Sequence, residues 1–200
     1  MSQSSSVAFF DSQFQQQVQN RDFQLNPFEL VALPYLKGHV LDFGCGLGNL
    51  AIAAAQRGCS VVALDASRSA IEHLKQRALD TALPVEAIEA DLRNHEVGGE
   101  FDCVVSIGLL MFFDCPTALR VLAMLQDRVR PGGIAAVNVL VEGTTYLDMF
   151  QHDQHCLFSR NEMAHRFTGW GALHSEFRDF DAPNGTIKSF VTLIARKPPL

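Results

Sequence analysis

The amino-acid sequence predicts an α/β fold with a doubly wound, mostly parallel sheet that ends in an antiparallel hairpin. From residue 38 onward, short and nearly unbroken apolar segments alternate with segments of helical periodicity. This pattern is typical of a parallel sheet covered by helices on both faces, and right-handed crossovers then make the sheet doubly wound. Near the C-terminus, residues 172–181 and 186–197 flank the turn Ala182-Pro183-Asn184-Gly185 and form the predicted hairpin.

The N-terminal part is expected to form two helices. Phe10, Phe14 and Val18 recur at i, i+4 and i+8, which predicts a short amphipathic helix laid over the body of the protein. Pro27 suits the first turn of a second helix that runs to Leu36.

The main domain is expected to span residues 37–200, after a helical extension of residues 1–36. A chain of 200 residues builds one full hydrophobic core, so a second independent domain is not expected. Parallel strands are predicted at residues 39–44, 60–65, 85–91, 101–108 and 134–141.

The helices between these strands are predicted from capping residues and apolar faces. Residues 49–57 are rich in alanine, and Gly58 ends that helix. Ser67 can cap the next helix. Residues 116–129 carry a strong helical period, after which Arg130-Pro131-Gly132-Gly133 is expected to turn the chain into the fifth strand.

A last helix is expected before the hairpin. Ser159-Arg160-Asn161-Glu162 matches a capping box, in which the Ser and Glu side chains bond to backbone N–H groups at the helix start. The helix that it opens would present Met163, Phe167 and Trp170 on one side.

Composition excludes several classes of partner. The net charge is −6 and no run of Lys or Arg occurs, which argues against nucleic acid and against anionic membrane surfaces. No apolar stretch reaches the roughly 18 residues of a transmembrane helix. The N-terminus lacks the basic and apolar regions of a secretory signal. The sequence does not predict an oligomeric state.

The five cysteines are expected to be reduced. Their number is odd, no C-x-x-C motif occurs, and most of them lie inside apolar segments. This usage is typical of a cytoplasmic protein. The cysteines are Cys45, Cys59, Cys103, Cys115 and Cys156.

Glycines alternate directly after the first predicted strand, at Gly44, Gly46 and Gly48. A strand, a glycine-rich turn and a helix make a site for a nucleotide-like ligand, because the bare backbone approaches the ligand closely. The dinucleotide fingerprint G-x-G-x-x-G would place its third glycine one residue later. Asp42 precedes the first glycine by two residues, and a carboxylate there would repel a pyrophosphate but suits a cationic ligand.

The stretch Asp42-Phe43-Gly44-Cys45-Gly46-Leu47-Gly48 resembles the first motif, (D/E)-x-G-x-G-x-G, of the class I S-adenosylmethionine-dependent methyltransferases. The resemblance covers residues 37–198. It implies S-adenosyl-L-methionine as the cofactor and a seven-stranded, Rossmann-like sheet whose seventh strand lies antiparallel beside the fifth.

The resemblance also implies cofactor contacts. Asp65, at the end of the second strand, would accept hydrogen bonds from the ribose hydroxyls, and Asp91 matches the acid that binds adenine in this family. The full expected set is Asp42, Gly44, Cys45, Gly46, Gly48, Asn49, Leu50, Asp65, Ala66, Asp91, Leu92, Ser106 and Ile107.

A narrower resemblance concerns the methyl acceptor. Residues 109–114, 158–170 and 191–198 look like segments of the tellurite-resistance (TehB-type) methyltransferases, a family proposed to methylate oxyanions such as tellurite and selenite. The final hairpin, however, offers Arg178 and Lys188 as its main cationic side chains. A metalloid oxyanion, a thiol and an amine therefore all stay open as small-molecule acceptors. The fourth strand carries no N-P-P-Y type motif, which argues against DNA and protein glutamine.

Candidates for catalysis follow the fifth strand. His152 and His155 lie in the segment 142–158, which should overhang the ligand crevice, and either could act as a base or as a donor to an oxyanion. Arg160 could attract an anionic acceptor. No metal is expected, because the two histidines and Cys156 have no fourth ligand to pair with.

The N-terminal extension is expected to fold over the cofactor as a lid. Arg21, within residues 20–24, would then contact the cofactor, and Phe9, Phe10 and Phe14 would help to exclude water.

Two alternative functions are compatible with the sequence. An NAD(P)-dependent oxidoreductase would use the same strand–turn–helix unit, but the early third glycine and the terminal hairpin argue against it. A non-catalytic protein that binds S-adenosylmethionine would carry the same motif as an enzyme.

Overall fold

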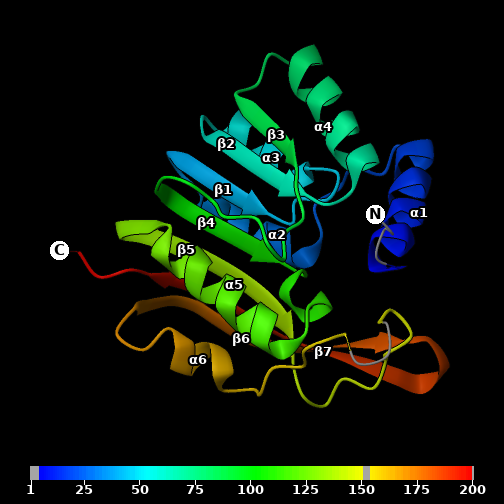
Figure 1. The fold of residues 1–200 in the computed structure, drawn as a ribbon, viewed down its shortest axis with the longest axis vertical. Helices are drawn as coiled ribbons and strands as arrows, with labels where there is room; N and C mark the ends of the chain where they lie inside the picture. Colours follow the sequence, from blue (N-terminus) through cyan, green and yellow to red (C-terminus); the bar gives the residue numbers. More distant parts are fainter. Residues whose placement is uncertain (1–4, 151–153, 200) are drawn as a thin grey trace.

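The computed structural model describes residues 5–150 and 154–199, with side chains from Asp11 onward except Ser12 (Figure 1). Its centre is a seven-stranded sheet in the order β3-β2-β1-β4-β5-β7-β6, in which β7 runs antiparallel to both of its neighbours. The predicted fold class is thereby confirmed. The strands are β1 His39–Phe43, β2 Ser60–Asp65, β3 Val85–Glu89, β4 Phe101–Ile107, β5 Val129–Leu140, β6 Gly171–Ala182 and β7 Thr186–Arg196.

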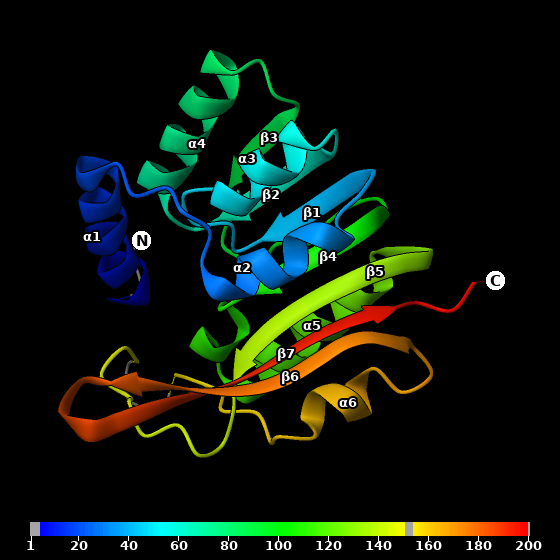
Figure 2. The ribbon, with the colours of Figure 1, turned by 180° about the vertical axis from the view of Figure 1, so that it is seen from behind.

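Helices cover both faces of the sheet (Figures 1 and 2). The core on one face includes side chains from α2, α3 and α4, and the core on the other includes side chains from α5 and α6. Helix α1 lies next to the start of α4, on the side toward which the parallel strands point (Figure 1). The helices are α1 Ser5–Asn20, α2 Pro27–Ala32, α3 Asn49–Gln56, α4 Arg68–Asp80, α5 Cys115–Asp127 and α6 Glu162–Arg166, with short 3₁₀ helices η1 Leu33–Tyr35, η2 Leu110–Phe112 and η3 Pro183–Gly185.

Capping residues set the helix starts that position the site. The Ser67 hydroxyl accepts a hydrogen bond from the Ala70 N–H at 3.1 Å, as predicted, so α4 begins directly after β2. Asp114 caps α5 in the same way, through the Thr117 N–H at 3.0 Å. These caps satisfy N–H groups that have no partner within the helix.

The expected turn before the fifth strand is wrong. Strand β5 already begins at Val129, and a bulge follows: Phe101 pairs with Val129, whereas Cys103 pairs with Ile134. A Cβ atom on Gly133 would lie 2.9 Å from the Asp102 carbonyl oxygen, so glycine permits this close approach of two backbones. The proline and the glycines, which had indicated a turn, instead form an irregular, bulged start of strand β5.

The predicted capping box of the last helix is also wrong. Helix α6 begins at Glu162, and the side chain of Asn161, the capping residue, makes no capping bond. Glu162 pairs instead with Arg166 at 2.7 Å, one helical turn along. The predicted apolar side is confirmed, because Met163 and Phe167 are buried.

Two cysteines are joined, contrary to the expectation that all five are reduced. Cys115, at the start of α5, forms a disulfide with Cys156, which lies 41 residues along the chain. The fold brings them together because the segment after β5 returns past η2, where the Cys156 N–H bonds to the Met111 carbonyl at 3.0 Å. Cys45, Cys59 and Cys103 are buried free thiols.

Within the ranges that the structure describes, no helix has both the length and the apolar character needed to cross a membrane.

Candidate functional site

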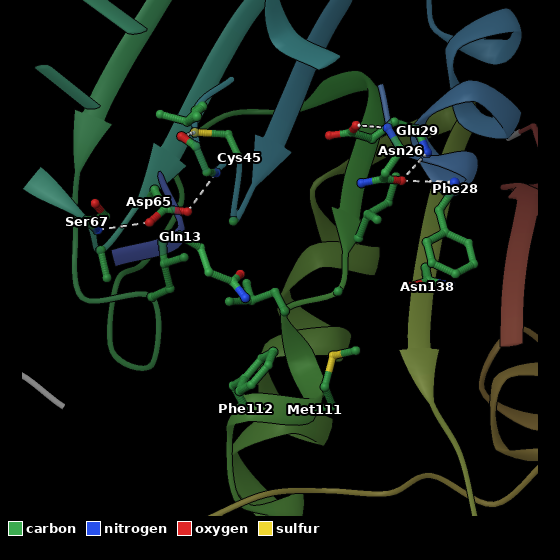
Figure 3. A pocket seen from close by; sticks show the side chains of 18 of the residues that line it. Gln13, Asn26, Phe28, Glu29, Cys45, Asp65, Ser67, Met111, Phe112 and Asn138 are labelled. Carbon is green, nitrogen blue, oxygen red and sulfur yellow. Dashed lines mark hydrogen bonds between the residues drawn. The ribbon is translucent and has the colours of Figure 1, made fainter. Parts of the chain in front are cut away.

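A cavity of about 550 Å³ lies at the carboxyl ends of the strands, between α1 and α2 (Figure 3). Its wall comes from the glycine loop after β1, from the ends of β2, β4 and β5, and from the hairpin strand β7. In doubly wound sheets, ligands bind in the crevice at this edge. The size is within the usual range for small-molecule sites.

The glycine loop needs its bare backbone. Gly44 and Gly46 have φ values of +89° and +52°, a backbone conformation that residues with a Cβ atom rarely adopt. A Cβ atom on Gly44 would lie 2.8 Å from the Leu109 side chain, and one on Gly46 would lie 3.1 Å from the Phe14 ring. The loop therefore accommodates one side chain from the segment after β4 and one from α1.

Asp65 is fixed at the cavity edge by two backbone groups. Its Oδ2 accepts a hydrogen bond from the Gly46 N–H at 2.8 Å, and its Oδ1 accepts one from the Ser67 N–H at 2.8 Å (Figure 3). Burial raises the pKa of this carboxyl. Each oxygen keeps a further lone pair, so the carboxylate can accept two more hydrogen bonds from a ligand.

Asp42 lies behind the cavity wall. Its side chain is 5% exposed, and its Oδ2 has no hydrogen-bond partner among the described residues. Burial, followed by the charges of Glu29 and Asp65, raises the pKa of Asp42 to about 8. A cation bound nearby would favour the ionised form of this carboxyl.

Most of the residues expected to bind the cofactor line the cavity: Gly44, Cys45, Gly46, Asn49, Asp65, Ala66, Asp91, Leu92 and Ile107. Gly48, Leu50 and Ser106 are buried behind the wall, like Asp42. Arg21 is exposed at the turn between α1 and α2, and the structure places it outside the cavity.

Asp91 lies at the rim. Its side chain is exposed, and its oxygens accept hydrogen bonds from the Arg93 N–H at 3.2 Å and from the Asn94 amide at 2.9 Å. These local bonds hold the carboxylate beside Leu92, which is buried in the wall.

Of the three candidates for catalysis, the two that the structure describes, His155 and Arg160, do not line the cavity. The His155 ring stacks on Phe150 at 4.7 Å, and Phe150 in turn contacts Phe112, which does line it. The Arg160 guanidinium lies 4.2 Å from the centre of the Phe177 ring, on β6. His152 lies outside the described residues, as do the side chains of Phe9 and Phe10. No group of three or more potential metal ligands occurs in the described part of the chain.

The segment before α2 also shapes the site, a contribution that was not predicted from the sequence. The Asn26 side chain accepts hydrogen bonds from the N–H groups of Phe28 and Glu29 at 2.9 Å, and Glu29 accepts one from the Asn26 N–H at 2.7 Å. This capping box aims Phe28 and Glu29 at the cavity (Figure 3). The pattern Asn26-Pro27-Phe28-Glu29 could have predicted it.

The far end of the cavity was also missed. Its wall is mainly apolar, and Phe28 packs on Phe190 with ring centres 4.7 Å apart. Asn138 is the one polar residue in the apolar run 134–141, a signal that the sequence contained. The lining residues at this end include Phe28, Met111, Phe112, Asn138, Leu140 and Phe190.

Comparisons with known proteins agree with this geometry. A family model described as a methyltransferase domain matches residues 40–133. A cypemycin N-terminal methyltransferase from a Streptomyces species is 38% identical over 99 residues, which are 48% of this chain and 39% of that protein. A carboxy-S-adenosyl-L-methionine synthase from Geobacter metallireducens is 31% identical over 165 residues, which are 77% of this chain and 67% of that protein.

The solved structure of TehB from Haemophilus influenzae is similar with a TM-score of 0.78 at 18% identity, over 90% of this chain and 65% of that chain. At this identity the likeness establishes the fold. The chain spans well under two thirds of the Streptomyces relative and about two thirds of the Geobacter relative.

Proposed function

Because the chain belongs to the class I S-adenosylmethionine-dependent methyltransferases, we propose that it transfers the methyl group of S-adenosyl-L-methionine to a small molecule. The observation that carries this proposal is the arrangement around the glycine loop. A bare backbone, the fixed Asp65 carboxylate and the buried Asp42 carboxyl meet there in one cavity.

These residues suit the chemical parts of the cofactor. Ribose hydroxyls donate hydrogen bonds, and the Asp65 oxygens have lone pairs to accept them. Asp91 and Leu92 would contact the adenine. The amino-acid end would lie against the glycine loop, toward Glu29 and Asp42. Neither of these two acids forms an ion pair with a residue that the structure describes.

When bound, the cofactor supplies a methyl group activated by a sulfonium. The residues of the chain align the acceptor with that group and exclude water. Helix α1 is placed to exclude water, because Gln13, Phe14 and Gln17 line the cavity. We therefore propose that residues 1–36 act as a lid on the domain formed by residues 37–200.

An oxyanion such as tellurite or selenite is not favoured as the acceptor. The cations on the described wall are Arg93 and Lys188. The Arg93 guanidinium already donates to the Phe112 carbonyl at 3.1 Å, and the Lys188 ammonium lies over the Tyr146 ring at 4.6 Å. A thiol or an amine suits the apolar wall better.

The cofactor assignment can be tested by calorimetric titration. We expect S-adenosylhomocysteine to bind with a Kd in the micromolar range and NADH to bind far more weakly. The absence of S-adenosylhomocysteine binding at millimolar concentration, or tighter binding of NADH, would overturn the proposal.

Turnover separates an enzyme from a protein that only binds the cofactor. The protein would be incubated with S-adenosylmethionine and a panel of oxyanions, thiols, amines and alcohols, and release of S-adenosylhomocysteine would be measured. Binding without release for any acceptor would favour the non-catalytic alternative.

A further inference from the structure

Among the described residues at the far end of the cavity, Asn138 carries a buried polar atom without a hydrogen-bond partner. Asn138 is 0% exposed to solvent, yet it lines the cavity. Its Oδ1 has no hydrogen-bond partner among the described residues. A buried amide oxygen without a partner costs free energy, which a donor on a bound molecule would recover.

The orientation of this amide is set by the hairpin. The Asn138 Nδ2 donates to the Thr192 hydroxyl at 3.0 Å and points toward the Val191 carbonyl at 3.5 Å. A carbonyl can only accept, so the nitrogen side of the amide must face β7. Oδ1 is therefore the amide atom that lacks a partner and can accept a hydrogen bond from a ligand.

The surroundings of Asn138 are apolar. Leu140, two residues along β5 on the same face of the sheet, pairs with Phe190 of β7, and Phe28 packs against Phe190. Met111 and Phe112 close the chamber from the other side (Figure 3). A molecule that fits here has a hydrophobic body and presents a hydrogen-bond donor to one point of the wall.

The charges near the chamber decide which donor is favoured. Glu29 lies on the cavity wall beside Phe28 (Figure 3), and Asp42 lies behind the wall, close enough for the charge of Glu29 to raise its pKa. In their ionised forms, which a nearby cation favours, these carboxyls stabilise a group that gains positive charge during the reaction and disfavour one that must become an anion. An amine gains positive charge on methylation, whereas a phenol reacts best as its anion.

The described wall contains no histidine, the usual general base for a hydroxyl acceptor. A neutral amine needs no such base, because it already carries a reactive lone pair. We propose, on the premise of the proposed methyltransferase function, that the acceptor is an amine with a hydrophobic body, whose N–H donates a hydrogen bond to Asn138 Oδ1.

The step balances without a further reactant. The amine nitrogen forms a bond to the methyl carbon with its lone pair. The carbon–sulfur bond of the sulfonium breaks, and its electron pair stays on sulfur as a neutral thioether. The positive charge thus moves from sulfur to the new ammonium, which loses its proton to water on release. Asn138 directs the N–H away from the methyl group and so directs the lone pair toward it.

A matched series of acceptors tests the proposal on the wild-type protein. Benzylamine, phenethylamine and their N-methyl forms would be compared with benzyl alcohol, benzyl mercaptan and selenite at alkaline pH, with release of S-adenosylhomocysteine as the readout. We expect kcat/KM for at least one amine to exceed that of the alcohol, the thiol and selenite by about tenfold or more. Equal or faster turnover of one of these three, or no turnover of any amine, overturns the inference.

Variants test the role of Asn138 by a measurement other than turnover. In Asn138→Leu, the binding of the preferred amine to protein saturated with S-adenosylhomocysteine should weaken about tenfold, and KM should rise similarly. The Kd of S-adenosylhomocysteine should stay unchanged. Asn161→Leu, at an exposed position without a capping bond, is the matched control. Unchanged amine binding in folded Asn138→Leu would overturn the assignment, and Asn138→Ala serves if the leucine variant does not fold.

The two proposals fail in different ways. Absence of S-adenosylhomocysteine binding to the wild type refutes the proposed function itself. Normal cofactor binding together with faster methylation of selenite, thiol or alcohol refutes only the amine and its contact with Asn138.

Discussion

Three carboxyl groups beside the cavity behave differently because their neighbours differ. Asp65 accepts two backbone hydrogen bonds, Glu29 accepts one within a helix cap, and Asp42 Oδ2 has none from the described residues. Burial raises the pKa of all three. The Asp65 carboxylate, which backbone groups hold in place, suits ribose hydroxyls as a hydrogen-bond acceptor. The Asp42 carboxyl, whose Oδ2 has no partner among the described residues, suits a nearby cation.

The role of Asp65 can be measured through cofactor affinity. In Asp65→Ala, S-adenosylhomocysteine binding should weaken by about 1–3 kcal/mol, because charge-assisted hydrogen bonds to the ribose are lost. Asp91→Ala is the comparison. Its carboxylate is exposed and already bonded to Arg93 and Asn94, so the loss should be smaller. Calorimetry on both variants checks this order, and a larger loss at Asp91 would contradict the ribose assignment.

Asp42 should make stability depend on pH. Its pKa is about 8 in the folded protein and near the ordinary 3.8 in the unfolded chain, so the folded state binds the proton more tightly. The stabilisation is fully present below the unfolded pKa and is lost as the pH rises through the folded pKa. Between about pH 5 and about pH 8, the wild type should lose stability relative to Asp42→Asn, with a slope of at most about 1.4 kcal/mol per pH unit.

Urea unfolding of the wild type and Asp42→Asn at several pH values in the absence of ligand measures this difference. Because asparagine cannot ionise, the variant reports the pH dependence of all the other titrating groups. Subtracting it from the wild type leaves the contribution of Asp42. A difference in unfolding free energy that does not change with pH would show that Asp42 is ionised in the folded protein.

At the level of elements, the described side chains of α1 that contact the domain include Asp11 and Phe14. Asp11 accepts hydrogen bonds from the Ser67 and Ser69 hydroxyls at the start of α4, where a carboxylate also meets a favourable helix dipole. Phe14 lies over Gly46 in the glycine loop. Both contacts place the helix beside the residues assigned to the cofactor, as the proposed lid requires.

Phe14→Ala should weaken S-adenosylhomocysteine binding about tenfold, since its ring both contacts the loop and excludes water from it. Gln15→Ala, at an exposed position of the same helix outside the cavity wall, should leave the Kd unchanged. Equal affinities of the two variants would mean that α1 does not act as a lid.

Sequence patterns predicted elements that local chemistry determines and missed those that tertiary contacts determine. The strand at residues 60–65 and the Ser67 cap depend on neighbouring residues and were confirmed. The segment 130–133 contains proline and glycine, which indicate a turn, but pairing of β5 with β4 makes it a bulge. The capping box at Ser159 failed for the same reason, because the loop before α6 is held by the Cys156 bridge and by pairing of Phe158 with Val141.

The site was predictable where it follows from strand order. The glycine loop, Asp65 and Asp91 lie at consecutive strand ends, so the parallel topology brings them to one edge. Asn138 and Phe190 meet only because β7 inserts antiparallel beside β5, and Glu29 arrives from outside the sheet. No spacing in the sequence relates these residues to the glycines.

At the scale of the whole molecule, different strands of the sheet support the two halves of the site. The parallel strands β1, β2 and β4 support the side assigned to the cofactor, and β5 with the hairpin supports the chamber around Asn138. Of the segment after β5, Met149 lines the cavity, and Cys156 is bonded to Cys115 of α5 by the disulfide. Met149 and Phe150 lie on this segment, next to Phe112.

The disulfide should stabilise the molecule and hold the acceptor chamber in shape. Because it closes a loop of 41 residues, the double variant Cys115→Ser/Cys156→Ser should lose about 2–4 kcal/mol of unfolding free energy. Amine turnover should show a higher KM, whereas cofactor affinity should persist, since the glycine loop is not attached to this segment. Reductant should lower the wild type to the stability of the variant and leave the variant unchanged. Thiol titration of the denatured protein should find three thiols before reduction and five after it; five thiols at the outset would show that the bridge does not form.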